Sequence, residues 1–138
     1  MSPAPSNPRA LADLYAYTLP GGWTVLAGKT DADNERLSLK IARPRDWWFH
    51  VRGMPGSHVL LQVGEAGEEP PREVLEAAAA VAAWHSKARA GGTVAVSGTL
   101  AQFVTKPRGA PHGTVSIRKE RVFKVRPALP AAPDSAAD

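Results

Sequence analysis

The sequence predicts an α+β domain, mostly antiparallel sheet, with one long alanine-rich helix and room for a second, short helix. Three observations lead to this fold class. Short runs of β-forming residues alternate with turns rich in Pro and Gly, residues 70–90 have the composition of a helix, and no internal repeat is present. With 138 residues, 43% hydrophobic and 22% charged, the chain has the composition of one ordinary globular domain.

The ends of the chain differ from its middle in composition. Residues 1–10 and 128–138 are rich in Pro, Ala and Ser, so we expect disordered tails on either side of a domain at 11–127. No apolar run reaches the roughly 18 residues of a membrane span and no signal segment is present, which predicts a cytoplasmic protein without a membrane partner. Because cysteine is absent, disulfides, thiol nucleophiles and Cys-ligated zinc are excluded.

The first elements are a hairpin and an ambiguous segment. Residues 11–18 and 23–27 contain β-formers, and the Pro and paired Gly of 19–22 favour a tight reversal between them. Residues 31–42 have three aliphatic side chains that alternate as on a strand, but Thr30 or Asp31 also suits the start of a helix. We favour the short helix.

A second hairpin and the principal helix follow. Residues 47–52 and 58–63 are apolar runs around the Gly- and Pro-containing turn 53–56, which predicts strand, turn, strand. The helix begins at Pro70–Pro71 and is expected to end near Ala90, before a pair of glycines. Its alanines would allow close packing on a sheet.

Two long strands complete the predicted sheet. They cover 93–104 and 114–125, and the turn-rich segment 106–113 connects them. In the second strand, Lys119 and Arg121 interrupt an otherwise apolar face. We therefore expect a bend or a β-bulge there that re-aims the side chains.

The densest chemistry lies between Asp46 and Leu60. On a strand, alternate residues share a face, so one face would carry the polar side chains and one aromatic ring, namely Asp46, Trp48, His50 and Arg52. A face with Trp, His and Arg can stack on a base and contact a phosphate. Ser57, with the backbone amides that follow Gly56, could form a small anion-binding concavity. In the structural alternative, Trp48 fills the core and His50 bonds to the backbone.

Positive charge is concentrated in one stretch of the chain. The formal net charge is +4, and residues 87–126 hold nine basic residues and one acidic residue. Such an asymmetry is typical of a surface that binds a polyanion, although a solvated basic face is the simpler alternative. We expect phosphate contacts from Lys106, Arg108 and Arg118.

Four segments together resemble a known family. The central one, Asp46-x-Trp48-Phe49-His50 followed by Pro55-Gly56-Ser57-His58-Val59, is similar to the signature of the NFACT-R domain, the RNA-binding module of the NFACT family. Three flanking segments also match: Gly28 to Leu37, with Lys29 where Arg is usual; the alanine-rich helix ending in Trp84-His85-Ser86-Lys87-Ala88; and Val104 to Val115.

The resemblance implies an RNA-binding module rather than an enzyme, without cofactor or metal. It implies tRNA or ribosomal RNA as partner, in translation or ribosome quality control. Since 138 residues leave no room for the other family domains, we expect a single-domain protein that works alone, on the ribosome, or with a separate protein that supplies them. The residues expected to bind RNA are Lys29, Asp46, Trp48, His50, Arg52, Ser57, His58, Lys87, Lys106, Arg108 and Arg118.

Two other functions stay open at this point. The same surface could bind a protein. Alternatively, Asp46, His50 and His58, with His85 or His112, could bind zinc or iron and activate water for hydrolysis. The spacing of the histidines matches no metal motif, and the sequence has no phosphate-binding loop and no nucleophile elbow.

Overall fold

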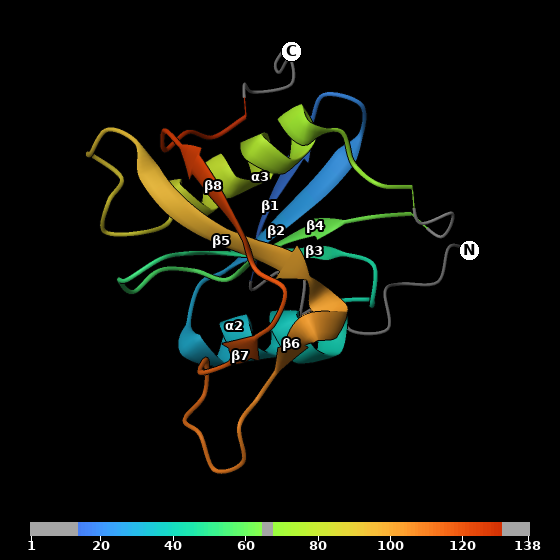
Figure 1. Cartoon of the computed structure of the whole chain (residues 1–138), viewed down its shortest axis with the longest axis vertical. Coiled ribbons are helices and arrows are strands. Elements are labelled where there is room, and N and C mark those ends of the chain that lie inside the picture. Colours follow the sequence, from blue (N-terminus) through green and yellow to red (C-terminus); the bar gives the residue numbers. More distant parts are fainter. Residues whose placement is uncertain (1–13, 65–67, 131–138) are drawn as a thin grey trace.

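The chain folds around one antiparallel six-stranded sheet. In the computed structural model, residues 14–64 and 68–130 are described; the tail at 1–10 and the end of the other tail, 131–138, lie outside them. The spatial order of the strands is β1 (Leu14–Leu19), β2 (Trp23–Gly28), β4 (Val59–Gln62), β3 (Trp47–Val51), β5 (Val94–Leu100) and β8 (Arg121–Val125), with every neighbouring pair antiparallel (Figure 1). The predicted α+β class is confirmed.

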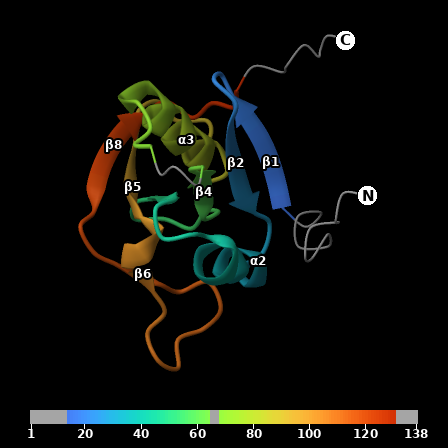
Figure 2. The same ribbon diagram turned by 90° about the vertical axis from the view of Figure 1, so that its right-hand side faces the viewer.

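Helices cover both faces of the sheet. Helix α3 (Arg72–Trp84) packs on one face, while α2 (Asp31–Arg36) and a π-helical turn (Leu37–Ile41) lie on the other. Figures 1 and 2 show α3 and α2 on opposite sides of the strands. Each face has its own apolar cluster, the larger beneath α3 and the smaller formed by Leu14, Leu26, Leu37, Leu60 and Ala101.

The first hairpin and the short helix are confirmed. In the hairpin, Leu19 pairs with Trp23, and Gly21 and Gly22 take φ of 94° and 87°, which side chains other than glycine rarely adopt. Residues 11–13 of the predicted strand are not among those described. Thr30 caps α2, because its hydroxyl accepts a hydrogen bond of 3.1 Å from the amide of Asp33.

The principal helix ends earlier than predicted. It stops at Trp84, and His85 already has φ −88° and ψ 37°. The hydroxyl of Ser86 donates to the carbonyl of Ala83 at 2.6 Å and accepts from the amide of Ala88 at 3.1 Å. These two backbone groups are therefore bonded to a side chain in place of the backbone partners they would have in a continuing helix. The expected end near Ala90 was wrong for this reason. The buried alanines do pack directly on the sheet.

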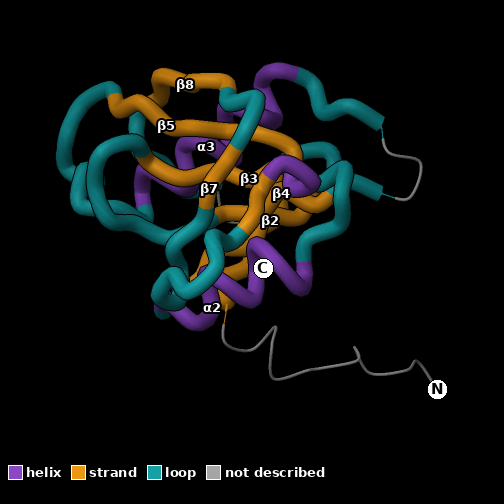
Figure 3. Tube along the Cα trace, turned by 60° about the horizontal axis from the view of Figure 1, so that its bottom comes forward, coloured by secondary structure: helices purple, strands orange, loops and turns teal. Residues whose placement is uncertain are grey.

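The two long C-terminal strands are each broken in two. After β5 the chain makes a 3-10 turn (Ala101–Phe103) and then forms β6 (Val104–Thr105), which pairs with β7 (Ser116–Ile117) in a small second sheet. Between β7 and β8, Lys119 takes a φ of 56°. The bend expected at this point is confirmed, and it moves the chain from the small sheet to the large one. Figure 3 shows β7 and α2 on the same side of the molecule.

Candidate nucleic-acid interface

The turn between β3 and β4 is packed against the end of α3. Gly53 has a φ of 76°, which the reversal requires. A Cβ atom on Gly56 would lie 3.1 Å from the Cβ of Ser86 and 3.1 Å from Cγ1 of Val51, so only glycine fits without a shift of its neighbours. The amide of Ser57 donates to the carbonyl of His85 at 3.1 Å. The motif and the helix end are therefore one structural unit.

The donors expected to form an anion-binding concavity at Ser57 are bonded within the chain. The hydroxyl of Ser57 donates to the carbonyl of Gly28 at 2.6 Å, and its amide is bonded to His85. The next amide, that of His58, donates to Oδ1 of Asn34 at 3.0 Å. Because these donors bind other parts of the chain, they hold β2 and α2 against the motif and do not point at a ligand.

Asp46 is also a structural residue. The residue is 2% exposed, Oδ1 accepts from the amide of Val63 at 2.8 Å, and Oδ2 accepts from the amide of Arg43 at 2.9 Å. The carboxylate thus fixes the start of β3 and the end of β4. Burial removes it from the predicted RNA contacts, since both oxygens are turned inward.

Trp48, Ser38 and His58 form a buried hydrogen-bonded chain. Nε1 of Trp48 donates to Oγ of Ser38 at 2.8 Å, and the same oxygen lies 2.8 Å from Nδ1 of His58. The serine hydroxyl therefore accepts from Trp48 and is also bonded to His58, so one oxygen joins the two rings. Trp48 is 3% exposed and cannot offer a ring face to a base, so its expected stacking role was wrong.

Both histidines of the motif favour the neutral form. Burial, together with the neighbouring His50, lowers the pKa of His58 to about 4, while backbone hydrogen bonds at Asn34 and Gly113 oppose this shift. Burial also lowers the pKa of His50, while hydrogen bonds of the ring with the backbone of Gly56 and Val51 oppose this shift. At neutral pH this part of the molecule therefore carries no histidine charge.

These histidines border a hollow of about 400 Å³ on the α2 side of the sheet, which we name the central hollow. Four of the predicted residues meet here, namely Trp48, His50, Arg52 and His58. The other lining residues are Val51, Gly53, Met54, Ser97, Gly113, Thr114, Val115 and Ile117. Nε of Arg52 lies 3.2 Å from a carboxylate oxygen of Glu120, and the arginine side chain is 52% exposed.

A second concavity, of about 370 Å³, lies on the other side of the same turn. Lys29 and Lys87, two predicted residues, line it together with Arg89, and all three side chains are exposed. We name it the cationic concavity; the rest of its lining is Tyr15, Gly28, Thr30, Asp31, Asn34, Pro55, Gly56, Ser57, His85 and Ser86.

Aromatic rings form part of the cationic concavity. Tyr15 stacks on His85 with ring centroids 4.4 Å apart, and Nζ of Lys29 lies 4.9 Å from the Tyr15 centroid. The hydroxyl of Tyr17 lies 2.7 Å from Nε2 of His85. Burial, and then the nearby Arg89, lower the pKa of His85. Sequence reasoning missed Tyr15 and Arg89; the position of Arg89 two residues after Lys87, in a segment already singled out, was the available signal.

The three residues of the C-terminal part that were expected to contact phosphate line neither concavity; they are Lys106, Arg108 and Arg118. Nζ of Lys106 is 3.1 Å from Oε1 of Glu35, and the same oxygen contacts Nδ1 of His112 at 3.1 Å and accepts from the amide of Gly113 at 3.2 Å. The hydrogen bond from Lys106 is the main cause that lowers the pKa of Glu35. Lys106 therefore fastens the loop 106–113 to α2.

Arg108 and Arg118 are exposed but line neither concavity. Arg108 lies in the loop that extends beyond α2 in Figures 1 and 2. The guanidinium of Arg118 lies 5.2 Å from the ring centroid of Phe103. The predicted basic residues thus spread over several surfaces instead of forming one stripe.

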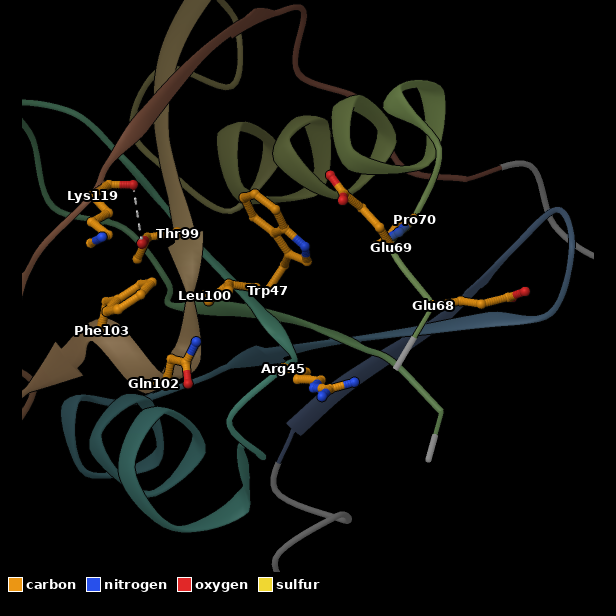
Figure 4. Close-up of a pocket in the computed structure, with 10 residues that line it drawn as sticks. All are labelled: Arg45, Trp47, Glu68, Glu69, Pro70, Thr99, Leu100, Gln102, Phe103 and Lys119. Carbon is orange, nitrogen blue, oxygen red and sulfur yellow. Dashed lines mark hydrogen bonds between the residues drawn. The ribbon is translucent and has the colours of Figure 1, made fainter. Parts of the chain in front are cut away.

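A third hollow, of about 360 Å³, was not anticipated from the sequence. Figure 4 shows Trp47, Leu100 and Phe103 around it, with Lys119 on one side, Glu68 and Glu69 on the opposite side, and Arg45 below Trp47. This mixture of apolar surface and both signs of charge fits the protein-binding alternative better than it fits a polyanion.

The residues considered for a metal-dependent hydrolase do not form a metal site in the described part of the chain. Within residues 14–64 and 68–130, no three His, Cys, Asp or Glu side chains form a group that could hold a metal ion. Asp46 binds backbone amides and does not approach the pair His50 and His58 as a ligand. Among the described helices, none is long and apolar enough to cross a membrane.

Comparison with known proteins decides the family. The family described as NFACT protein RNA binding domain matches residues 14–119, which includes the central hollow and the cationic concavity. The chain belongs to this family. The NFACT-R resemblance of the four segments is thereby confirmed. The two concavities flank residues 52–58, the turn between β3 and β4 that carries the family motif and that we name the signature turn.

Relatives share this NFACT-R domain over most of its length. The chain is 35% identical to the Rqc2 homolog RqcH of Bacillus subtilis over 114 residues, 83% of this chain and 19% of the relative. It is 36% identical to the Rqc2 homolog RqcH of Streptococcus suis over 107 residues, 78% of this chain and 19% of the relative. The chain therefore spans about a fifth of the length of these relatives.

A solved structure is similar as well. It is the C-terminal part of the fibronectin/fibrinogen-binding protein from Streptococcus suis, which aligns with a TM-score of 0.77 at 34% identity. The alignment covers 83% of this chain and 46% of that one. The NFACT-R fold is thus recognisable in both sequence and structure.

Proposed function

We propose that this NFACT-R domain binds RNA through the cationic concavity. The observation that carries the proposal is the convergence of Lys29, Lys87 and Arg89 on one concavity next to the signature turn. Lys29 follows β2, whereas Lys87 and Arg89 follow α3, so the fold gathers these charges from two distant segments. The family description, an RNA-binding domain, supports the same function.

The chemistry of the concavity suits the phosphate backbone. Three exposed cations face one carboxylate in its lining, that of Asp31, so the local charge is positive. Tyr15 is 41% exposed beside them and adds aromatic surface. Cations that neutralise phosphates release counterions, and aromatic rings next to them add stacking that tolerates any base.

Charge neutralisation tests the proposal. Replacing Lys29, Lys87 and Arg89 by Gln should weaken binding to tRNA. The fall of log affinity with log salt should also become less steep, by about 2 to 3 in the slope, because each lost phosphate contact removes roughly 0.7 to 0.9. Fluorescence anisotropy over a salt series measures this slope. A matched variant replaces three exposed cations outside both concavities by Gln, namely Lys40, Lys124 and Arg126. If both variants lower the slope equally, the binding is not localised to this concavity.

The RNA partner we propose is tRNA or ribosomal RNA in ribosome quality control. The relatives named Rqc2 homolog RqcH support this context. Their remaining domains could be supplied by a separate protein. Competition between labelled tRNA and unlabelled ribosomal RNA fragments distinguishes the two RNAs. Because the proposal is a binding function, it assigns no catalytic residue.

A further inference from the structure

The central hollow differs in chemistry from the cationic concavity. Arg52 is the one lining residue of the central hollow that carries a formal charge at neutral pH, and it is paired with Glu120. Both lining histidines favour the neutral form because they are buried. A phosphate group placed in the hollow would lose its hydration without gaining an unpaired cation. The hollow is therefore suited to an uncharged ligand.

Its walls suit a flat ring. The rings of Trp48 and His50 are stacked, with centroids 6.0 Å apart and 20° between their planes, and His58 meets both at a steep angle. His50 is the partly exposed member of this group and presents its ring to the hollow. Aliphatic side chains complete the lining, namely Val51, Met54, Val115 and Ile117. A volume of about 400 Å³ lies within the range of small-ligand sites.

The polar groups on the floor are already fixed in position. Ser38 holds Trp48 and His58, and the hydroxyl of Ser97 donates to Glu120. The loop that forms the opposite wall is held by the bond from the Gly113 amide to Glu35. A ring entering the hollow would thus meet preorganised walls, which lowers the entropy cost of binding.

The hollow and the cationic concavity share the signature turn. Gly53 and Met54 line the hollow, while Pro55, Gly56 and Ser57 line the concavity. Neutral and cationic sites on two sides of one turn match the two parts of a nucleotide, a flat uncharged base and a charged phosphate.

We propose that the central hollow receives one unpaired nucleobase of the RNA whose phosphates lie in the cationic concavity. This inference rests on the proposed RNA-binding function and deepens it. A base in a duplex would first have to leave its stack and its partner, whereas a base in a loop or single strand would not. The domain therefore selects RNA that has an unpaired nucleotide.

A substitution that fills the hollow tests this inference. Thr114 is exposed and lines the hollow, so Thr114→Trp would occupy it with little effect on the core; Thr105→Trp is the matched control, since Thr105 is exposed and lines neither site. The probes are a short single-stranded RNA and its duplex with the complementary strand. Thr114→Trp should weaken single-strand binding about tenfold, the order expected for one lost stacked base, and should leave duplex binding unchanged. Thr105→Trp should change neither.

A second measurement uses the wild-type protein. Removing the base from one nucleotide of the single strand at a time, while keeping its phosphates, should weaken binding about tenfold at one position and little at the others. When the same RNAs are tested with Thr114→Trp, removing the base at that position should no longer weaken binding.

The outcomes separate the inference from the proposed function. If wild-type protein binds no RNA at low salt, the proposed function fails. If RNA binds and the cationic concavity variant weakens it, but Thr114→Trp and every base removal are neutral, the base site alone is overturned. Equal wild-type affinity for single strand and duplex also overturns it.

Discussion

His58 makes the stability of the domain sensitive to acid. The residue is 4% exposed, and its Nδ1 lies 2.8 Å from the hydroxyl oxygen of Ser38. Burial holds the pKa of His58 at about 4, compared with 6.5 when the ring is in water. As the pH falls below 6.5 the unfolded chain therefore gains a proton at this position, and the folded chain gains one only near pH 4.

The magnitude follows from the two pKa values. One pKa unit corresponds to about 1.4 kcal/mol, so His58 removes about 2 kcal/mol of the free energy of unfolding between pH 7 and pH 5 and about 3 kcal/mol by pH 4. Stability is complete above the pKa of the unfolded state and is lost as the pH decreases. His50 and His85, whose pKa values are also lowered by burial, act in the same direction.

Urea unfolding at pH 7 and at pH 5 measures this effect. His58→Asn keeps a side chain that can hydrogen-bond to Ser38 but cannot titrate. Between the two pH values its free energy of unfolding should therefore fall by about 2 kcal/mol less than that of the wild type. His112→Asn is the control, because the His112 side chain is 69% exposed. An unchanged pH dependence in His58→Asn would refute the reasoning.

Three further substitutions test the packing around the site. Ser38→Ala should cost about 1 to 3 kcal/mol of the free energy of unfolding, measured in urea, because it leaves two buried ring nitrogens unpaired. Gly98→Ala should cost about 1 to 3 kcal/mol in the same assay, since the new Cβ would lie 2.8 to 2.9 Å from two phenylalanine rings. Glu35→Gln should change stability little but should raise hydrogen exchange in 106–113, since it weakens the ion pair with Lys106. Unchanged stability in the first two variants, or unchanged exchange in the third, would contradict these assignments.

Much of the fold could be predicted because it depends on local signals. Pro and Gly mark the turns, alternation marks the faces of β3, and Thr30 marks the start of α2. The end of α3 could not be predicted, since it depends on the hydroxyl of Ser86, whose alternative bonds only a three-dimensional structure reveals. The division of the C-terminal strands was signalled by Lys119 as a bend, but not as a change of sheet.

The site was harder to predict because burial and pairing are long-range properties. The sequence could show that Asp46 and Trp48 share a face of β3 but not that α2 and the π-helical turn cover that face. Lys106 had the charge expected of a phosphate contact, yet its partner Glu35 lies far away in the chain. Arg89 lies near Lys87 in sequence, but only the fold brings both beside Lys29.

Amide chemical-shift mapping of the labelled domain during titration with RNA tests the central claim most directly. We predict changes around the signature turn, in residues 28–30, 53–57, 85–87, 89 and 113–115, which line the cationic concavity and the central hollow. Changes confined to 45–47, 68–70 and 99–103, around the hollow of Figure 4, would contradict the account, as would the absence of any change.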